Sequence, residues 1–407
     1  MLLLAALAAG CSSRVAPMTQ PGHGYAEAED EAWLLAQANL AAAELDEQGV
    51  ELDDPAVTAY LTRIGNTLAP PGLPPNFAFR YHIVRSANVN AFALPQGDIF
   101  LNLGLLVQLD NEAQLAQVLA HEMTHVLERH GIEALRSRRN KAVAVQVASI
   151  ATLGLSSAFA SVPYVASVTS YRRDQEEEAD TVAFATVRAA GYDPAAAASV
   201  YDTLAAITPS DAAAGESIYS THPSLAARSA YTRDLLGTAP AAAPRADAEA
   251  YRAAVVIPLQ PEFIRLLLQA RQFAAARQQA ERIVAAQPDA AWAYCAMAAA
   301  DQGAADDPTA AALERAQRAG KTLLQDPDIS VEEATIPAER ERAAAGYRRC
   351  LELDPSAAVA HRGLGLLAQQ QGDTQTARRE LSIYLAQAPA AADRRYIVHV
   401  LAAGAGQ

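Results

Sequence analysis

The sequence predicts a mainly α-helical protein with one small β-sheet, organised as two domains. A length of 407 residues exceeds what one compact core usually holds. Alternating, strand-like patterns occur only between residues 77 and 102, whereas helical spacing of apolar residues recurs elsewhere. Residues 239–250 have the Ala- and Pro-rich composition of a linker, and residues 251–405 after it contain no convincing strand. The second domain is therefore expected to be all-helical.

The N-terminus has the features of a secretory leader. The first ten residues are apolar, and small residues directly precede Cys11. This arrangement resembles the lipobox of bacterial lipoproteins, although no basic residue precedes the apolar run, and a simple cleaved leader is the alternative. We expect residues 1–11 to be a lipoprotein-type signal peptide with lipidation at Cys11. Residues 12–28 would then be a flexible tether, and Ser12 favours the periplasmic side of the outer membrane as the location.

The first domain is expected to begin with two helices. Helical patterning starts near Glu29 and continues past Leu45. A second helix is expected over Pro55–Leu68, with Asp53 or Asp54 as its N-cap, because proline suits the first helical position.

Strands and further helices follow in the same domain. The expected strands are Phe77–Val84, Asn90–Leu94 and Asp98–Asn102, the last two joined by the turn at residues 95–97. A helix capped by Asp110 or Asn111 should run to about His130, and another should cover Asp174–Ala190.

The helix that ends near His130 carries the pattern HExxH. Residues four apart share one helical face, so His121 and His125 can reach a single ion. Glu122 lies beside that face and is expected to activate a water molecule as general base. A catalytic zinc also needs a third protein ligand and an open position.

The next predicted helix offers the third ligand. Glu176 and Asp180 are again four residues apart. We expect Glu176 to bind the metal and Asp180 to accept a hydrogen bond from the far nitrogen of a ligand histidine. Glu177 and Glu178 are alternative candidates for the third ligand because they lie next to Glu176 in the sequence. Neither of them is followed by an acidic residue four positions later.

HExxH followed some 50 residues later by ExxxD resembles family 48 of the zinc metallopeptidases. That family includes HtpX, the CAAX prenyl proteases and the Oma proteases, and the sequence is most similar to its BepA-like periplasmic members with a tetratricopeptide (TPR) tail. The resemblance implies a zincin-type metalloprotease domain, which we place at residues 29–238, with one Zn²⁺ per chain and endopeptidase activity.

The resemblance extends to two further segments. Residues 90–106 look like the family's segment before the active helix, which forms an edge strand along the cleft. An extended substrate would then pair with a strand made of Asp98, Ile99, Phe100, Leu101 and Asn102. Thr221-His222-Pro223 with Arg228 looks like the family's HPxxxxR element. This implies that His222 is a removable fourth ligand and that Arg228 stabilises the transition state; the alternative for His222 is packing at a helix end. His130 is expected to be structural.

The C-terminal region shows a weak repeat. Pro355 and Pro389 are 34 residues apart, which is the TPR period, and Pro288 lies 67 residues before Pro355. Numbered back from Pro389, Leu364 and Gly365 fall at the repeat's Leu-Gly positions, and Ala377 falls at its small position, where the two helices of a repeat touch. An unrelated alanine-rich helical bundle is the alternative.

Two features leave alternatives open. Residues 142–171 carry no charge and exceed the roughly 20 residues that span a bilayer. Their Ala-, Ser- and Thr-rich composition favours a cover over the active site, with a membrane span as the alternative. Cys295 and Cys350 either pair in an oxidising compartment or are two buried helix cysteines.

Together these features predict an envelope zinc endopeptidase that cleaves misfolded or stalled proteins, particularly outer-membrane proteins. Its helical tail would recruit them or dock on the assembly machinery. The net charge of −14 argues against a nucleic-acid partner. The rival functions are a chaperone or assembly factor with latent protease activity plugged by His222, an integral-membrane processing protease, and a repeat scaffold with an inactive protease domain.

Overall fold

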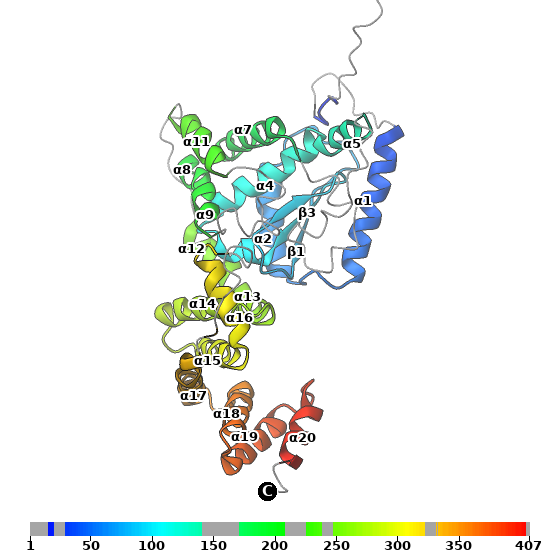
Figure 1. Ribbon diagram of the computed structural model, residues 1–407. Coiled ribbons are helices and arrows are strands. Elements are labelled where there is room, and N and C mark those ends of the chain that lie inside the picture. Colours follow the sequence, from blue (N-terminus) through cyan, green and yellow to red (C-terminus); the bar gives the residue numbers. More distant parts are fainter. Residues whose placement is uncertain are drawn as a thin grey trace, which may run out of the picture. The chain divides into compact units, whose positions relative to one another are not determined.

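The structure of the protein is a computed structural model (Figure 1). It describes residues 15–19, 29–140, 171–207, 225–237, 247–321, 331 and 333–403. The chain divides into two compact units, Met1–Phe263 and Ile264–Gln407. Cys11, His222 and residues 142–170 of the charge-free segment lie outside the described residues.

Unit 1 is a helical domain around a small sheet. Its α-helices are α1 (Glu29–Glu47), α2 (Pro55–Leu68), α3 (Leu103–Gln108), α4 (Glu112–Leu127), α5 (His130–Asn140), α7 (Arg173–Ala189), α8 (Pro194–Ala198), α9 (Val200–Ile207), α11 (Leu225–Leu236) and α12 (Ala248–Tyr251). A π-helical turn, η3 (Arg252–Val256), continues into α13 (Ile257–Gln269), which crosses the boundary between the units. The expected helix starts are confirmed, as at α2, where the side chain of Asp54 accepts the N–H groups of Ala56 and Val57.

The sheet has three strands in the order β1-β3-β2, and the predicted substrate strand is its centre. The strands are β1 (Arg80–Val84), β2 (Ala91–Ala93) and β3 (Asp98–Asn102). β1 pairs with β3 in parallel, and β2 pairs with β3 in the antiparallel direction. Because both sides of β3 are already hydrogen-bonded, the prediction that β3 is an edge strand that pairs with substrate is wrong. Among the described residues, β2 has one neighbouring strand and is an edge.

The sheet supports the helix that carries HExxH. One apolar cluster joins α1 to the sheet and to α5 through Leu34, Leu45, Phe92, Phe100 and Ile132. Helix α4 packs against β2, β3, α2 and α7, and it is buried over its whole length. The strands and surrounding helices therefore hold α4 as a central, water-excluded rod.

The described residues of unit 2 form helices and their connections, which confirms the mainly helical prediction. They are α14 (Phe273–Ala286), α15 (Ala291–Asp306), α16 (Pro308–Arg318), α17 (Ile336–Leu353), α18 (Ala358–Gln370), α19 (Thr374–Gln387) and α20 (Arg394–Ala403), with a 3₁₀ turn, η4, at Glu333–Thr335. Gly365 lies where α18 meets α19, since a Cβ atom there would stand 2.6 Å from Leu381 Cγ. Ala377 is also buried.

Between Pro288 and Pro355, two helices pack against each other although they are not consecutive in the sequence. Helix α15 packs along α17, and α16 is inserted between them in sequence. A disulfide joins Cys295 of α15 to Cys350 of α17. In the described residues, the closely packed helices α15 and α17 are separated in sequence by α16, whereas the two helices of a 34-residue repeat are consecutive.

No helix within the described part of the chain combines the length and apolarity needed to cross a membrane.

Candidate metal centre

Helix α4 presents two histidines to the interior of unit 1. It begins after Asn111, whose side chain accepts the N–H of Gln114. His121 and His125, one turn apart, lie on the same side of the helix, and their Nε2 atoms are 3.0 Å apart. Both residues are almost fully buried. This local geometry follows from the spacing of four residues.

Helix α7 brings a carboxylate to the same point. Its first turn is fixed by Gln175, whose side chain accepts the N–H of Arg172. Glu176 follows and is buried. Its Oε2 atom is 3.5 Å from Nε2 of His121, and its Oε1 atom is 3.6 Å from Nε2 of His125. Ligand atoms of the three residues all lie within 4.8 Å of one another.

The neighbouring acids of α7 point elsewhere. Glu177 and Glu178 are exposed, and an oxygen of Glu178 lies 3.6 Å from Nε2 of His130. Among these three consecutive glutamates, Glu176 alone joins the two histidines.

The spacing of the three ligand atoms fits a small divalent ion. Atoms bound at about 2.0–2.2 Å to a tetrahedral centre lie about 3.4 Å from one another. The separations of 3.0, 3.5 and 3.6 Å are close to this value. Two imidazole nitrogens and one carboxylate oxygen are also ligands that zinc accepts at catalytic sites. The residues present therefore fit a metal with three protein ligands.

Asp180, one turn after Glu176, holds the ring of His121. Its Oδ1 atom is 2.7 Å from Nδ1 of His121, which leaves Nε2 directed toward the other ligands. Asp180 also accepts hydrogen bonds from the hydroxyl groups of Tyr201, at 2.7 Å, and Tyr231. The carboxylate is thus fixed by groups from α4, α9 and α11.

Arg228 of α11 completes this buried cluster. Its Nε and Nη2 atoms each lie 2.7 Å from an oxygen of Asp180, in a two-pronged pairing. Its Nη1 atom is 3.6 Å from Oε2 of Glu176, and the guanidinium group lies over the ring of Tyr201. Arg228 therefore reaches the edge of the ligand set while it is held by Asp180.

The electrostatic balance of the cluster follows from these contacts. Burial and the positive charge of Arg228 both lower the pKa of His121, but the charge and hydrogen bond of Asp180, together with the hydrogen bond to Glu176, outweigh them and raise it to about 9. Burial raises the pKa of Asp180, but Arg228 and His121 outweigh burial and hold it well below its ordinary value. The carboxylate is therefore charged over the whole physiological range of pH.

Glu122 is buried at the side of the site. It borders a small cavity together with His121, Tyr201 and Arg228. Its neighbours in that cavity include Gln117, whose side-chain amide donates to the hydroxyl of Tyr201. The predicted base thus lies in the same enclosed space as one predicted ligand and the predicted stabilising arginine.

His130 has a closer relation to the site than the sequence suggested. It does not share the ion position, but its Nδ1 atom is 2.8 Å from Nδ1 of His125. Burial lowers the pKa of His130 to about 4, so its ring is neutral. Tyr171 stacks on the ring of His125 with centroids 3.7 Å apart. The spacing of His130 from His125 was the only sequence signal for this contact.

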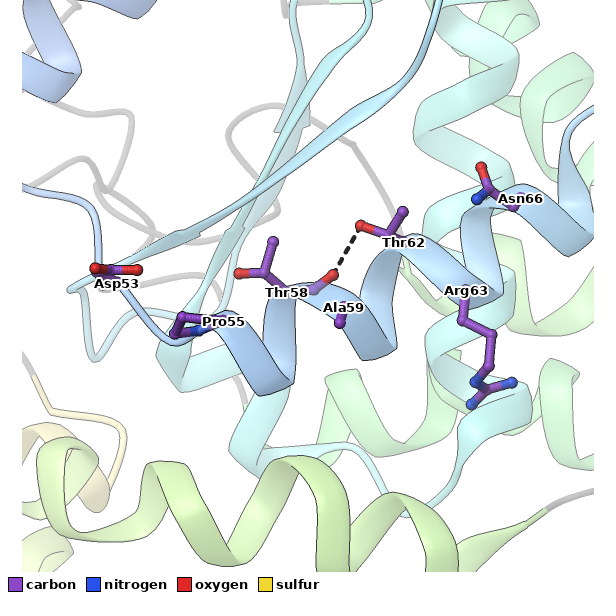
Figure 2. Close-up of a pocket in the computed structure, with 7 residues that line it drawn as sticks. All are labelled: Asp53, Pro55, Thr58, Ala59, Thr62, Arg63 and Asn66. Atoms are coloured by element: carbon purple, nitrogen blue, oxygen red, sulfur yellow. Dashed lines mark hydrogen bonds between the residues drawn. The ribbon is translucent and has the colours of Figure 1, made fainter.

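A hollow along α2 is separate from these residues. Figure 2 shows its lining, which consists of Asp53, Pro55, Thr58, Ala59, Thr62, Arg63 and Asn66. The hydroxyl of Thr62 donates to the carbonyl oxygen of Thr58 within the helix. None of the predicted site residues lines this hollow.

Comparison with known families gives one match over this region. Residues 55–235 match the model of peptidase family M48. The matched range contains His121, His125, Glu176, Asp180 and Arg228.

Known proteins similar to the chain are proteases by name, and two of the three described here are named as metalloproteases or metalloendopeptidases. The chain is 29% identical over 164 residues to the beta-barrel assembly-enhancing protease of Yersinia pestis, covering 37% of this chain and 33% of that protein. It is 30% identical over 173 residues to the mitochondrial metalloendopeptidase OMA1 of Schizosaccharomyces pombe, covering 41% and 49% of the two chains. It is 27% identical over 180 residues to the metalloprotease YcaL of Escherichia coli, covering 43% and 66%. The match spans about a third of the length of the beta-barrel assembly-enhancing proteases.

Proposed function

Because residues 55–235 form a domain of peptidase family M48, we propose that the chain is a zinc endopeptidase of the cell envelope that cleaves misfolded or stalled outer-membrane proteins. The observation that carries the proposal is the convergence of His121, His125 and Glu176 within 4.8 Å, beside the buried Glu122. Two helices present these side chains, and their spacing fits one tetrahedral ion.

The ligands in this proposal are Nε2 of His121, Nε2 of His125 and the carboxylate of Glu176. When bound, zinc would polarise the scissile carbonyl and lower the pKa of a water molecule. The carboxylate of Glu122 takes the proton of that attacking water and gives it to the leaving amine. Burial of the site excludes bulk water, so that charges act strongly on one another.

Asp180 and Arg228 have supporting roles in the proposal. Asp180 keeps the proton of His121 on Nδ1, so that Nε2 offers its lone pair. Arg228 compensates the charge of Asp180 and stabilises negative charge that develops on the substrate carbonyl. His222 as a removable fourth ligand remains part of the proposal.

The substrate class follows from the sheet and from the relatives. An extended peptide can add to the edge of β2 (Ala91–Ala93), which packs against α4. Proteins that offer such segments are unfolded or incompletely assembled. The name of the beta-barrel assembly-enhancing proteases supports β-barrel outer-membrane proteins as the substrates.

The domain organisation and location also belong to the proposal. Residues 1–11 would be the signal peptide, 29–238 the peptidase domain, 239–250 the linker and 251–405 a TPR-like tail. Residues 12–28 would connect the signal peptide to the peptidase domain, but residues 15–19 are hydrogen-bonded to α4 and α5, so this part of the predicted flexible tether is fixed on the domain. A lipid on Cys11 would hold the chain on the periplasmic side of the outer membrane. The tail would bind substrates or the assembly machinery.

The substitution Glu122→Gln tests the mechanism. It removes the proton acceptor and leaves all three ligands, so the variant should bind zinc as the wild type does but fail to digest an unfolded β-barrel protein. Glu177→Gln, an exposed glutamate near the site, is the matched control and should retain activity. Full activity of Glu122→Gln would end the proposed mechanism.

A further inference from the structure

A short N-terminal segment contacts the C-terminal end of α4, the helix that carries His121 and His125. Residues 15–19 form the dark-blue turn beside α5 in Figure 1. The N–H of Met18 donates to the carbonyl oxygen of Leu127, the last residue of α4, at 2.8 Å. The carbonyl oxygen of Ala16 accepts a hydrogen bond from Nη1 of Arg129 at 3.0 Å. The segment is therefore fastened to the end of the helix that carries both histidines.

Arg129 forms the turn that ends this helix. Its φ of 58° lies in the left-handed region, which is unfavourable for a residue with a side chain. The guanidinium group is buried and pairs with Glu31 of α1, and it also reaches the carbonyl oxygen of Ala16. These contacts offset the cost of the turn, so the N-terminal segment helps to hold the conformation directly after α4.

Glu133 connects the same segment to the second ligand helix. Its Oε1 atom accepts the N–H of Val15 at 2.9 Å, and its Oε2 atom accepts Nε2–H of Gln175 at 3.1 Å. Gln175 precedes Glu176 and closes the first turn of α7 through Arg172. Glu133 and Gln175 are both buried, so the hydrogen bond between them is shielded from water.

The side chain of Met18 lies behind a ligand histidine. Met18 is 7% exposed. It borders one small cavity together with His125, Val126 and Tyr171, whose ring stacks on His125. Any displacement of the segment would open the space behind this imidazole.

We propose that Val15–Thr19 is a positioning strap that holds α4 and α7 at the separation at which His121, His125 and Glu176 share one ion. Glu133 is the positioning residue that joins the strap to α7. The inference rests on the metal site of the proposed function. It predicts that loss of a strap contact weakens metal binding even though no ligand is changed.

The test compares substitutions that differ in one hydrogen bond, in the full-length chain. Val15→Pro removes the N–H that Glu133 accepts, whereas Val15→Ala keeps it. Glu133→Gln leaves one acceptor oxygen for the two donors that bind Glu133, the N–H of Val15 and the side-chain amide of Gln175. Glu177→Gln, at an exposed position on α7, is the control. Zinc affinity is measured by competition with a chelator, and coordination geometry by the visible absorption of the Co²⁺ form.

Val15→Pro and Glu133→Gln should each weaken zinc binding about 10- to 100-fold and alter the Co²⁺ spectrum. Val15→Ala and Glu177→Gln should bind like the wild type. If Val15→Pro and Glu133→Gln both bind zinc with wild-type affinity and give the wild-type Co²⁺ spectrum, the proposal is overturned. This holds even if both variants unfold at a lower temperature than the wild type. If Val15→Pro does not fold, the near-isosteric Glu133→Gln decides alone.

The result is distinguishable from failure of the proposed function. A wild-type chain that binds zinc through the three ligands but digests no unfolded protein would contradict the peptidase proposal and leave the strap test intact. Normal metal binding in the strap variants, with proteolysis abolished by Glu122→Gln, would contradict the strap alone.

Discussion

The Oδ1 atom of Asp180 lies 2.7 Å from Nδ1 of His121, while Nε2 of the same ring lies 3.5 Å from Oε2 of Glu176. This contact fixes both the orientation of the imidazole and the nitrogen that carries the proton. The proposed ligand set therefore depends on a residue outside it, and that residue is held in turn by Arg228 and two tyrosines.

Asp180→Asn tests this dependence. An amide lacks the negative charge that keeps the proton on Nδ1, and it cannot satisfy the donors of Arg228 as the carboxylate does. We expect zinc affinity to fall about 10- to 100-fold in a chelator competition. Asp202→Asn, whose carboxylate pairs with Arg233 at the surface, is the control. Equal affinities of the Asp180 variant and the wild type would show that the contact does not position the ligand.

His130→Gln tests the contact behind the second ligand. The Nδ1 atoms of His130 and His125 are 2.8 Å apart, so His130 helps to hold the ring of His125. We expect the zinc affinity to fall by an amount within the same 10- to 100-fold range. We also expect the Co²⁺ absorption spectrum to change. His399→Gln on the exposed face of α20 should change neither. An unchanged spectrum in His130→Gln would return His130 to a purely structural role.

A pH dependence of stability is expected from His82 of β1. Burial by itself lowers its pKa, but hydrogen bonds to Asp98 and Glu51 outweigh burial and raise it from 6.5 to about 9. Because the folded-state pKa is the higher one, the stabilisation is fully present below pH 6.5 and is lost as pH rises through 9. It amounts to at most about 3 kcal/mol.

Urea unfolding of the wild type and of His82→Gln across this range measures the effect. The wild type should lose stability between pH 6.5 and 9, and the variant should lose less over the same interval. Parallel curves for the two proteins would contradict the assigned ion pairs.

The disulfide between α15 and α17 should stabilise unit 2. Cys295 and Cys350 are separated by 55 residues in sequence. Closing a loop of this length stabilises a folded chain by about 2–4 kcal/mol. The double substitution Cys295→Ala with Cys350→Ala should lower the stability of unit 2 by that amount in thermal unfolding, while zinc content stays unchanged. Addition of reductant to the wild type should have a similar effect; insensitivity to both would argue against the pairing.

Features determined by local sequence were predictable. The spacing of His121 and His125 places both rings on one face of a helix wherever that helix lies. The start of α2 follows from Asp54 and Pro55, and the ExxxD spacing selected Glu176 over its exposed neighbours. Each of these inferences needs only a helix and its periodicity.

Features that depend on distant contacts were not predictable. The turn at residues 95–97 indicated strands on both sides of it and so identified β3, but the central position of β3 results from pairing with β1 and β2 on opposite sides. Tyr201 and Tyr231 reach Asp180 from separate helices, without a spacing that relates them to it. His130 meets His125 because the chain turns at Arg129, whose left-handed backbone no residue preference indicated.

Metal analysis of the purified protein directly tests the proposal that His121, His125 and Glu176 bind one zinc ion. Zinc is measured per chain in the wild type, in Glu176→Ala and in Glu177→Ala as the matched control. We expect one zinc per chain in the wild type and in the control, with little or none in Glu176→Ala. A wild type that binds no stoichiometric metal, or a Glu176→Ala protein with undiminished zinc, would contradict it.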